Sequence, residues 1–77
     1  MTLKIISALQ VLFEGEVVSV TLPGEKGSFT VLPRHASLIS TLLKGKISYR
    51  DAEGEHQVEV AGGIADIDNN VVSVCVY

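Results

Sequence analysis

The sequence predicts an all-β fold, a flattened β-sandwich or barrel of roughly 8 to 10 short strands. The first observation is a two-residue period in runs that are rich in valine and isoleucine, which is typical of strands with one buried face. The second is the close spacing of glycine, proline and asparagine between these runs, where the chain changes direction. Interdomain linkers are absent, so we expect one domain over residues 1–77.

Length and charge exclude several classes of function. A chain of 77 residues buries only about 60% of its unfolded surface, which leaves little material for a catalytic cleft, and we expect a noncatalytic protein. The net charge of −3 and the scattered lysines and arginines argue against a nucleic-acid or anionic-membrane surface. The single cysteine, Cys75, cannot form an internal disulfide, which favours a cytosolic address.

Residues 5–13 are the longest candidate for a targeting segment. Gln10 interrupts this run, and Glu14-Gly15-Glu16 stands where a small-residue cleavage site would belong, so no signal peptide is assigned. No stretch approaches the roughly 18 consecutive apolar residues of a membrane helix.

The first strand that the two-residue period predicts covers residues 16–22, with Val18, Val20 and Leu22 on one face. The following residues 23–27 are interpreted as a loop whose glycines supply positive φ and whose charged side chains stay solvated. A phosphate-binding loop is excluded there, because the glycine spacing and the Gly-Lys-Ser/Thr ending of such loops are missing.

Residues 36–43 have two interpretations. Their apolar side chains fit a helical stripe for two turns, but Pro33 before them and Gly45 after them leave too little length for a stable helix. We therefore predict a strand. Residues 46–50 follow as a second clear strand, in which Ile47 and Tyr49 alternate with polar neighbours.

The last part of the chain predicts two further strands, a turn and a bulge. Residues 57–60 and 71–76 alternate, and the second run places Cys75 on the face opposite its valines at 72, 74 and 76. Asn69-Asn70 suits a two-residue primed turn, because asparagine tolerates positive φ. Gly62-Gly63 suits a bulge or kink in a strand.

No group of side chains predicts a catalytic, cofactor or metal site. His35, His56 and Cys75 are not paired at ligand spacing, and Cys75 has no neighbouring base, so it is interpreted as an inert packed thiol. His56 is interpreted as a solvated strand residue. His35 has two interpretations, a turn residue bonded to backbone or a contact with a partner. Asp66 and Asp68 share one strand face and are interpreted as a solvated hairpin end.

Five segments stand out when the sequence is taken as a whole. They are Phe13-Glu14-Gly15-Glu16-Val17, residues 22–40 (LPGEKGSFTVLPRHASLIS), Gly45-Lys46-Ile47, Gly62-Gly63-Ile64 and residues 70–74 (NVVSV). In this order and spacing they resemble the N-terminal β-sandwich of the epsilon subunit of F-type ATP synthases. The resemblance covers almost the whole chain, and its most specific part runs from 27 to 40. Ala8 and Ser37 depart from it, since many members have proline there.

The resemblance implies a noncatalytic rotor subunit without a cofactor. In that family the sandwich docks on the gamma subunit at the foot of the central stalk and rests on the polar loops of the c-ring. This arrangement couples the flow of protons or sodium ions to ATP synthesis. Membrane association would occur only through the complex, at the cytoplasmic face of a bacterial inner membrane.

The resemblance also implies contact residues. Ser7, His35 and Ser40 match family positions that face gamma, and Ser28 matches the position that meets the c-ring. The resemblance ends at Tyr77 and does not include the C-terminal helical hairpin that many members carry. It therefore implies coupling without the block on rotation that this hairpin can impose.

A biotinyl or lipoyl carrier domain is the alternative from a different class. Such domains are also all-β and of similar length, and they present a lysine at a hairpin tip, where Lys26 would be the modified residue. The neighbouring Glu25 and Gly27 lack the flanking residues that these domains share.

Overall fold

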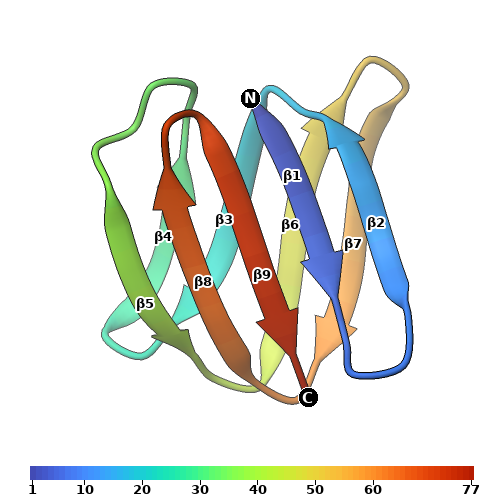
Figure 1. Ribbon diagram of the computed structural model, residues 1–77, viewed down its shortest axis with the longest axis vertical. Coiled ribbons are helices and arrows are strands. Elements are labelled where there is room, and N and C mark those ends of the chain that lie inside the picture. Colours follow the sequence, from blue (N-terminus) through green and yellow to red (C-terminus); the bar gives the residue numbers. More distant parts are fainter.

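The computed structural model describes all of residues 1–77 and confirms the all-β prediction, with nine strands and no helix. The strands are β1 (Thr2–Ile6), β2 (Val11–Glu16), β3 (Ser19–Gly24), β4 (Gly27–Val31), β5 (Leu38–Leu42), β6 (Gly45–Asp51), β7 (Gly54–Val60), β8 (Gly63–Asp68) and β9 (Val71–Val76). Figure 1 shows how closely these short strands follow one another.

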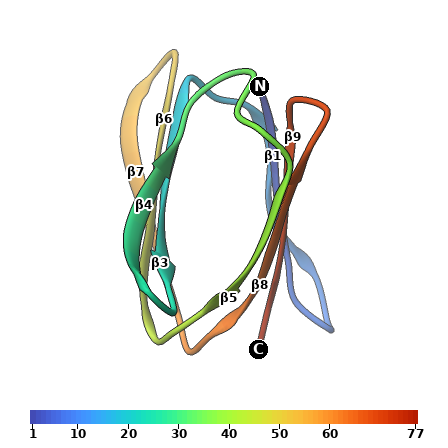
Figure 2. The same cartoon turned by 90° about the vertical axis from the view of Figure 1, so that its left-hand side faces the viewer.

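The strands form one curled sheet that folds into two layers (Figure 2). Its order is β2-β1-β9-β8-β5-β3-β6-β7, and β4 is added beside β3. The first layer contains β2, β1, β9, β8 and β5, and the second contains β7, β6, β3 and β4. The layers are joined where β5 meets β3 through a single pair, Gly24 and Leu42.

The core lies between the layers and is entirely apolar. Because successive side chains of a strand point to opposite faces, every second residue of the central strands enters this space. In β8 and β9 the burial alternates strictly, and all three even-numbered valines of β9 are buried. The core has 15 buried hydrophobic residues and no buried polar or charged residue. Hydrophobic burial without polar desolvation therefore holds the two layers together.

The strand predicted over residues 16–22 is wrong at its start. Val17 is buried and Val18 is 55% exposed, which is the reverse of the predicted phase. At these two residues the chain leaves β2 in the first layer and crosses to β3 in the second. Their N–H groups donate to the carbonyl oxygens of Met1 and Arg50, both at 2.8 Å. The crossing restarts the alternation, so Val18 is not in phase with β3.

The other strands predicted by periodicity are confirmed, although their ends differ by a few residues. The ambiguous segment 36–43 contains β5, and the segments 46–50, 57–60 and 71–76 fall in β6, β7 and β9. The two-residue period alone did not predict β1, β2 or β4. Part of β4 was interpreted as loop, whereas the turn between β3 and β4 consists only of Glu25 and Lys26.

The turn residues satisfy different steric demands. Asn69 and Asn70 have φ of 50° and 63°, which confirms the predicted primed turn between β8 and β9. Gly62, with φ of 149°, lies at the junction of β7 and β8 rather than inside a strand. At Gly63 a side chain would collide with the carbonyl oxygen of Cys75. The double glycine thus lets β8 begin directly against β9.

We expect the buried core side chains to dominate the stability of the fold. Leu22 is fully buried, so Leu22→Ala should lower the free energy of unfolding by about 2–5 kcal/mol through lost burial and a residual cavity. Leu9 is 95% exposed, and the matched change Leu9→Ala should cost at most about 0.5 kcal/mol. Urea unfolding of both variants at pH 7 measures the difference. Equal losses would contradict the assignment of the core.

Candidate functional site: two outer faces and an open side

The outward side chains of β1, β9, β8 and β5 form a surface that we call the first-layer face. The strand registers bring Ile6, Cys75, Ile64 and Thr41 into one row across it. Ile64 is 50% exposed, and Ile39 in the neighbouring row is 71% exposed. Large apolar side chains that remain exposed close together indicate a surface for a partner.

The outward side chains of β7, β6, β3 and β4 form the second-layer face, which is more uniformly polar, whereas the first-layer face combines its isoleucines with Asp66, Ser73 and Lys4. Its central row joins Gln57, Ser48, Thr21 and Thr30 through the strand registers, and the two threonine hydroxyls lie 2.9 Å apart. An exposed ion pair, Arg50 with Glu55 at 3.2 Å, covers part of the next row. Such a surface is well solvated, so the two outer faces are not equivalent as docking surfaces.

The structure places Ser7 and His35, two of the predicted gamma contacts, at opposite ends of the sandwich. Ser7 follows β1, and its N–H donates to the carbonyl oxygen of Gln10 at 2.9 Å within the turn to β2. His35 lies in the loop between β4 and β5. Its N–H donates to the carbonyl oxygen of Leu32 at 3.1 Å, and its Nδ1 is 2.7 Å from that of Ala36. These bonds confirm the turn interpretation of His35, while a role as partner contact stays a prediction.

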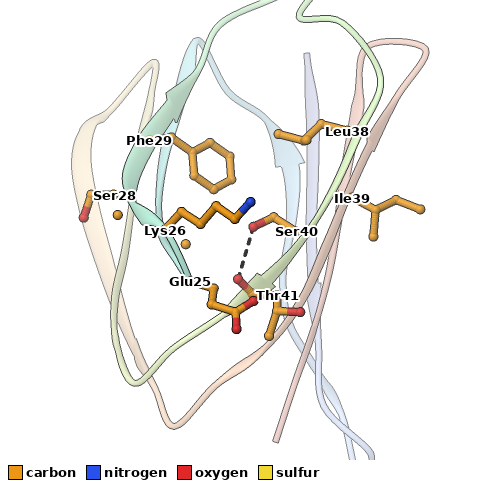
Figure 3. Close-up of a pocket in the computed structure, with 10 residues that line it drawn as sticks. Glu25, Lys26, Ser28, Phe29, Leu38, Ile39, Ser40 and Thr41 are labelled. Carbon is orange, nitrogen blue, oxygen red and sulfur yellow. Dashed lines mark hydrogen bonds between the residues drawn. The ribbon is translucent and has the colours of Figure 1, made fainter.

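The two remaining predicted contacts lie on the strands that flank one opening. Ser40 is on β5, and its hydroxyl donates to the carbonyl oxygen of Thr41 at 3.1 Å (Figure 3). Ser28 is on β4 and points away from that opening. The predicted gamma set, Ser7, His35 and Ser40, therefore does not form one compact patch. It follows the border of the first layer.

The opening between β4 and β5, which we call the open side, contains the larger of two hollows in the molecule. The hollow has a volume of about 480 Å³. Phe29 and Leu38 approach each other across it, and Lys26 extends toward Ser40 (Figure 3). Sequence reasoning missed this feature, because it depends on the separation of β4 and β5 between the two layers.

A second, smaller hollow of about 330 Å³ lies at the other end of the domain, where Met1, Val17 and Pro33 come together. Two acidic residues, Glu16 and Asp51, line it. No group of three or more His, Cys, Asp or Glu side chains is placed so that it could hold a metal ion. The structure has no helix of the length and apolarity that crossing a membrane would require.

Rings of the hairpin of β6 and β7 stack with Phe13 of β2, and the stack ends at the contact of His56 with Asp51. Tyr49 packs between Phe13 and His56, with ring centroids 4.3 Å and 5.3 Å away. Nε2 of His56 is 3.0 Å from Oδ1 of Asp51, which also accepts the N–H of Glu53 at 2.8 Å. His56 is on a strand, β7, as predicted, and its side chain is 38% exposed. Its ring also packs on Tyr49, which the sequence did not predict.

Three groups have shifted pKa values, and none of them belongs to the predicted contacts. The N–H of Glu53 stabilises the carboxylate of Asp51, with a further contribution from His56, and lowers the pKa of Asp51. Burial, with a smaller effect of the charge on Asp51, raises the pKa of Tyr49. The pKa of Glu16 is lowered chiefly by the hydroxyl of Thr2, which donates to it at 2.6 Å.

Comparison with protein families matches residues 1–77 to the β-sandwich domain of the ATP synthase delta/epsilon chain. An ATP synthase epsilon chain of Leptospira borgpetersenii is 36% identical over 74 residues, which are 96% of this chain and 58% of that protein. An ATP synthase epsilon chain of Campylobacter jejuni is 40% identical over 72 residues, 92% of this chain and 56% of that protein. The chain therefore spans little more than half the length of these relatives.

Solved structures share the fold. A chain of the Euglena gracilis mitochondrial ATP synthase has a TM-score of 0.88 at 22% identity, with 96% of this chain and 48% of that chain covered. A chain from the central stalk and c-ring of the Tetrahymena thermophila mitochondrial ATP synthase has a TM-score of 0.81 at 13% identity, with 97% and 61% covered. At these identities the likeness concerns the fold alone.

The lowered pKa of Asp51 predicts a pH-dependent contribution to stability. The contribution is fully present above the pKa of the unfolded chain, about 3.9, and disappears as the pH falls through the lower pKa of the folded state. Asp51→Asn should therefore lower the urea midpoint at pH 7, and this difference from the unmodified chain should shrink toward pH 2. Asp66→Asn, on the exposed first-layer face, is the control and should show a small difference that does not follow this course.

Proposed function

This chain belongs to the family of β-sandwich domains of ATP synthase delta and epsilon chains, and we propose that it serves as a noncatalytic domain of the central stalk of an F-type ATP synthase. The observation that carries the proposal is the match over residues 1–77, together with relatives at 36% and 40% identity that are ATP synthase epsilon chains. The carrier-domain alternative with a modified Lys26 gains no support from these relatives.

In this proposal the domain connects the gamma subunit to the polar loops of the c-ring. Ion flow turns the ring, and the domain transmits the rotation to gamma, with either protons or sodium ions as the coupling ion. It is a peripheral component, held at the cytoplasmic face of a bacterial inner membrane only through the complex. A close-packed core without buried polar groups supports a mechanical role, because such interiors deform little under load.

We further propose that gamma docks against the first layer. The exposed Ile64 and Ile39 of the first-layer face support this orientation, because the second-layer face offers mainly hydroxyl, amide and charged groups. Ser7, His35 and Ser40 would contact gamma along the border of that layer. Ser28, near the tip of the hairpin of β3 and β4, would meet the c-ring.

Association with the stalk can be tested on complexes isolated from bacterial membranes. Tagged chain should copurify with gamma and the c subunit. Ile64→Glu should reduce the recovered gamma by at least about tenfold, because the contact would bury an unpaired charge. Ser48→Glu on the second-layer face is the matched control and should leave recovery unchanged. Absence of gamma and c subunit from the unmodified complex would disprove the proposed function.

The orientation can be tested in a background in which Cys75→Ser removes the native thiol, by attaching a photoactivatable maleimide-benzophenone cross-linker to single introduced cysteines. Ser7→Cys and His35→Cys should cross-link to gamma, and Ser28→Cys to a loop of the c-ring. Ser48→Cys should cross-link to neither. Gel analysis of the products identifies the partner, and cross-linking of gamma through position 48 would mean that the sandwich is turned over.

A further inference from the structure

The exposed edges of the sandwich differ in charge. The edge strand β2 carries Glu14 and Glu16, and the edge strand β7 carries Glu55 and Glu59. Charged side chains on edge strands discourage the addition of a further strand. By contrast, β4 (GSFTV) and β5 (LISTL), which border the open side, contain no charged residue at all. The two strands that border this side therefore lack charged residues of their own, and the charges at the hollow are those of Glu25 and Lys26 in the turn between β3 and β4.

The free edge of β4 has backbone groups without partners. Pro23 lies opposite Ser28, and this pair cannot exchange hydrogen bonds because proline has no N–H. The carbonyl oxygen of Pro23 instead accepts the N–H of Leu43 at 2.9 Å. Hydrogen-bonded and non-bonded pairs alternate in an antiparallel ladder, so Thr30 shares the orientation of Ser28. Both residues direct N–H and C=O away from β3, toward the open side.

The facing edge of β5 is free over most of its length. On one side β5 pairs with β8, and on the other side it meets β3 only at Leu42. The carbonyl oxygen of Thr41 accepts the N–H of Glu25 at 2.9 Å, so Thr41 points away from β8. The N–H and C=O of Ile39, two residues earlier, also point away from β8, but they have no backbone partner on that side.

The space between these edges has the size and lining for an extended chain. The hollow of about 480 Å³ is closed at one end by the bonds that join β3 to β5 near Gly24. Phe29 and Leu38 point into it from opposite strands (Figure 3). A strand paired with β4 would place alternate side chains against these two residues, because the period of an extended chain is two.

We propose that the open side is an acceptor groove that binds an extended, uncharged segment of another protein as an added strand along β4. Strand addition draws its affinity from main-chain hydrogen bonds and its specificity from pockets for alternate side chains. In the groove, the free N–H and C=O groups of Ser28 and Thr30 would form the main-chain hydrogen bonds, and the apolar contact with Phe29 would select the side chains of the segment. The segment should be uncharged where it runs along β4 and β5, because neither strand offers an opposite charge and the charged lining residues Glu25 and Lys26 lie in the turn between β3 and β4.

A second copy of the chain is a weaker occupant on the grounds of area. Two copies paired through β4 would share strands of five residues each, whereas a stable interface needs about 800 Å² from each partner. A segment that enters the groove contacts both layers. The inference goes beyond the proposed role in the stalk and does not depend on it, because the proposed c-ring contact uses the Ser28 side chain, which points away from the open side, whereas the groove uses the Ser28 backbone.

The test uses the unmodified chain and a capped heptapeptide of alternating threonine and valine as the probe. Nuclear magnetic resonance titration should shift the amide signals of Ser28, Thr30 and Ile39. At saturation, hydrogen exchange at Ser28 and Thr30 should slow by about tenfold or more, since their amides gain partners. Absence of binding, or shifts confined to β2 or β7, would overturn the proposal.

Two controls separate strand pairing from general stickiness. The same peptide, N-methylated at alternate residues on its pairing edge, keeps its side chains but loses donors, and it should not bind. Thr30→Pro should abolish binding, whereas Thr30→Val, which keeps the N–H but loses the hydroxyl bond to Thr21, should retain it. If Thr30→Pro does not fold, the N-methylated peptide decides. Equal binding of both peptides, or a dimer of the chain in sedimentation that the peptide cannot dissociate, would refute the groove.

Discussion

The apolar core between the two layers, which we also call the seam, is the constraint on which the rest of this structure depends. A chain of 77 residues has little surface to bury, and it uses 15 apolar side chains for one continuous core without a single buried polar residue. The seam demands strict alternation in the central strands β8, β9 and β6. It also demands glycine where backbones approach, as at Gly63 against Cys75, because any side chain there would force β8 away from β9.

Since the seam takes up the inner faces, the outer faces are free to differ. The first-layer face presents isoleucines with few partners, and the second-layer face presents rows of hydroxyls and exposed charges. This asymmetry fits the proposed role in the stalk, in which one face binds a partner and the other remains solvated. The edges repeat the pattern, with glutamates on β2 and β7 and neutral strands around the open side. The first-layer face is therefore distinguished by its exposed isoleucines, and the open side by the absence of charged residues from its two strands.

Family membership and physical reasoning contribute different parts of the functional conclusion. The match to ATP synthase delta/epsilon chains identifies the assembly in which the domain is proposed to work. The structure adds that Ser7 and His35 lie at opposite ends of the sandwich, so a single partner that contacts both, as proposed for gamma, would extend along a whole layer. It also shows that Asp51 and His56 have a structural role in the hairpin of β6 and β7, because the carboxylate of Asp51 accepts the N–H of Glu53 and so stabilises the turn.

The sequence by itself determined the elements whose signals are local. Alternation in residues 46–50 and 71–76 and the paired asparagines at 69 and 70 predict their strands and turn, because period and φ preference act within a few residues. Tertiary structure alone decided the rest. Val17 and Val18 exchange their predicted faces because hydrogen bonds to Met1 and Arg50 carry the chain between layers. The open side likewise arises from where the curled sheet leaves β4 and β5 apart, and no local pattern encodes a distance between strands in different layers.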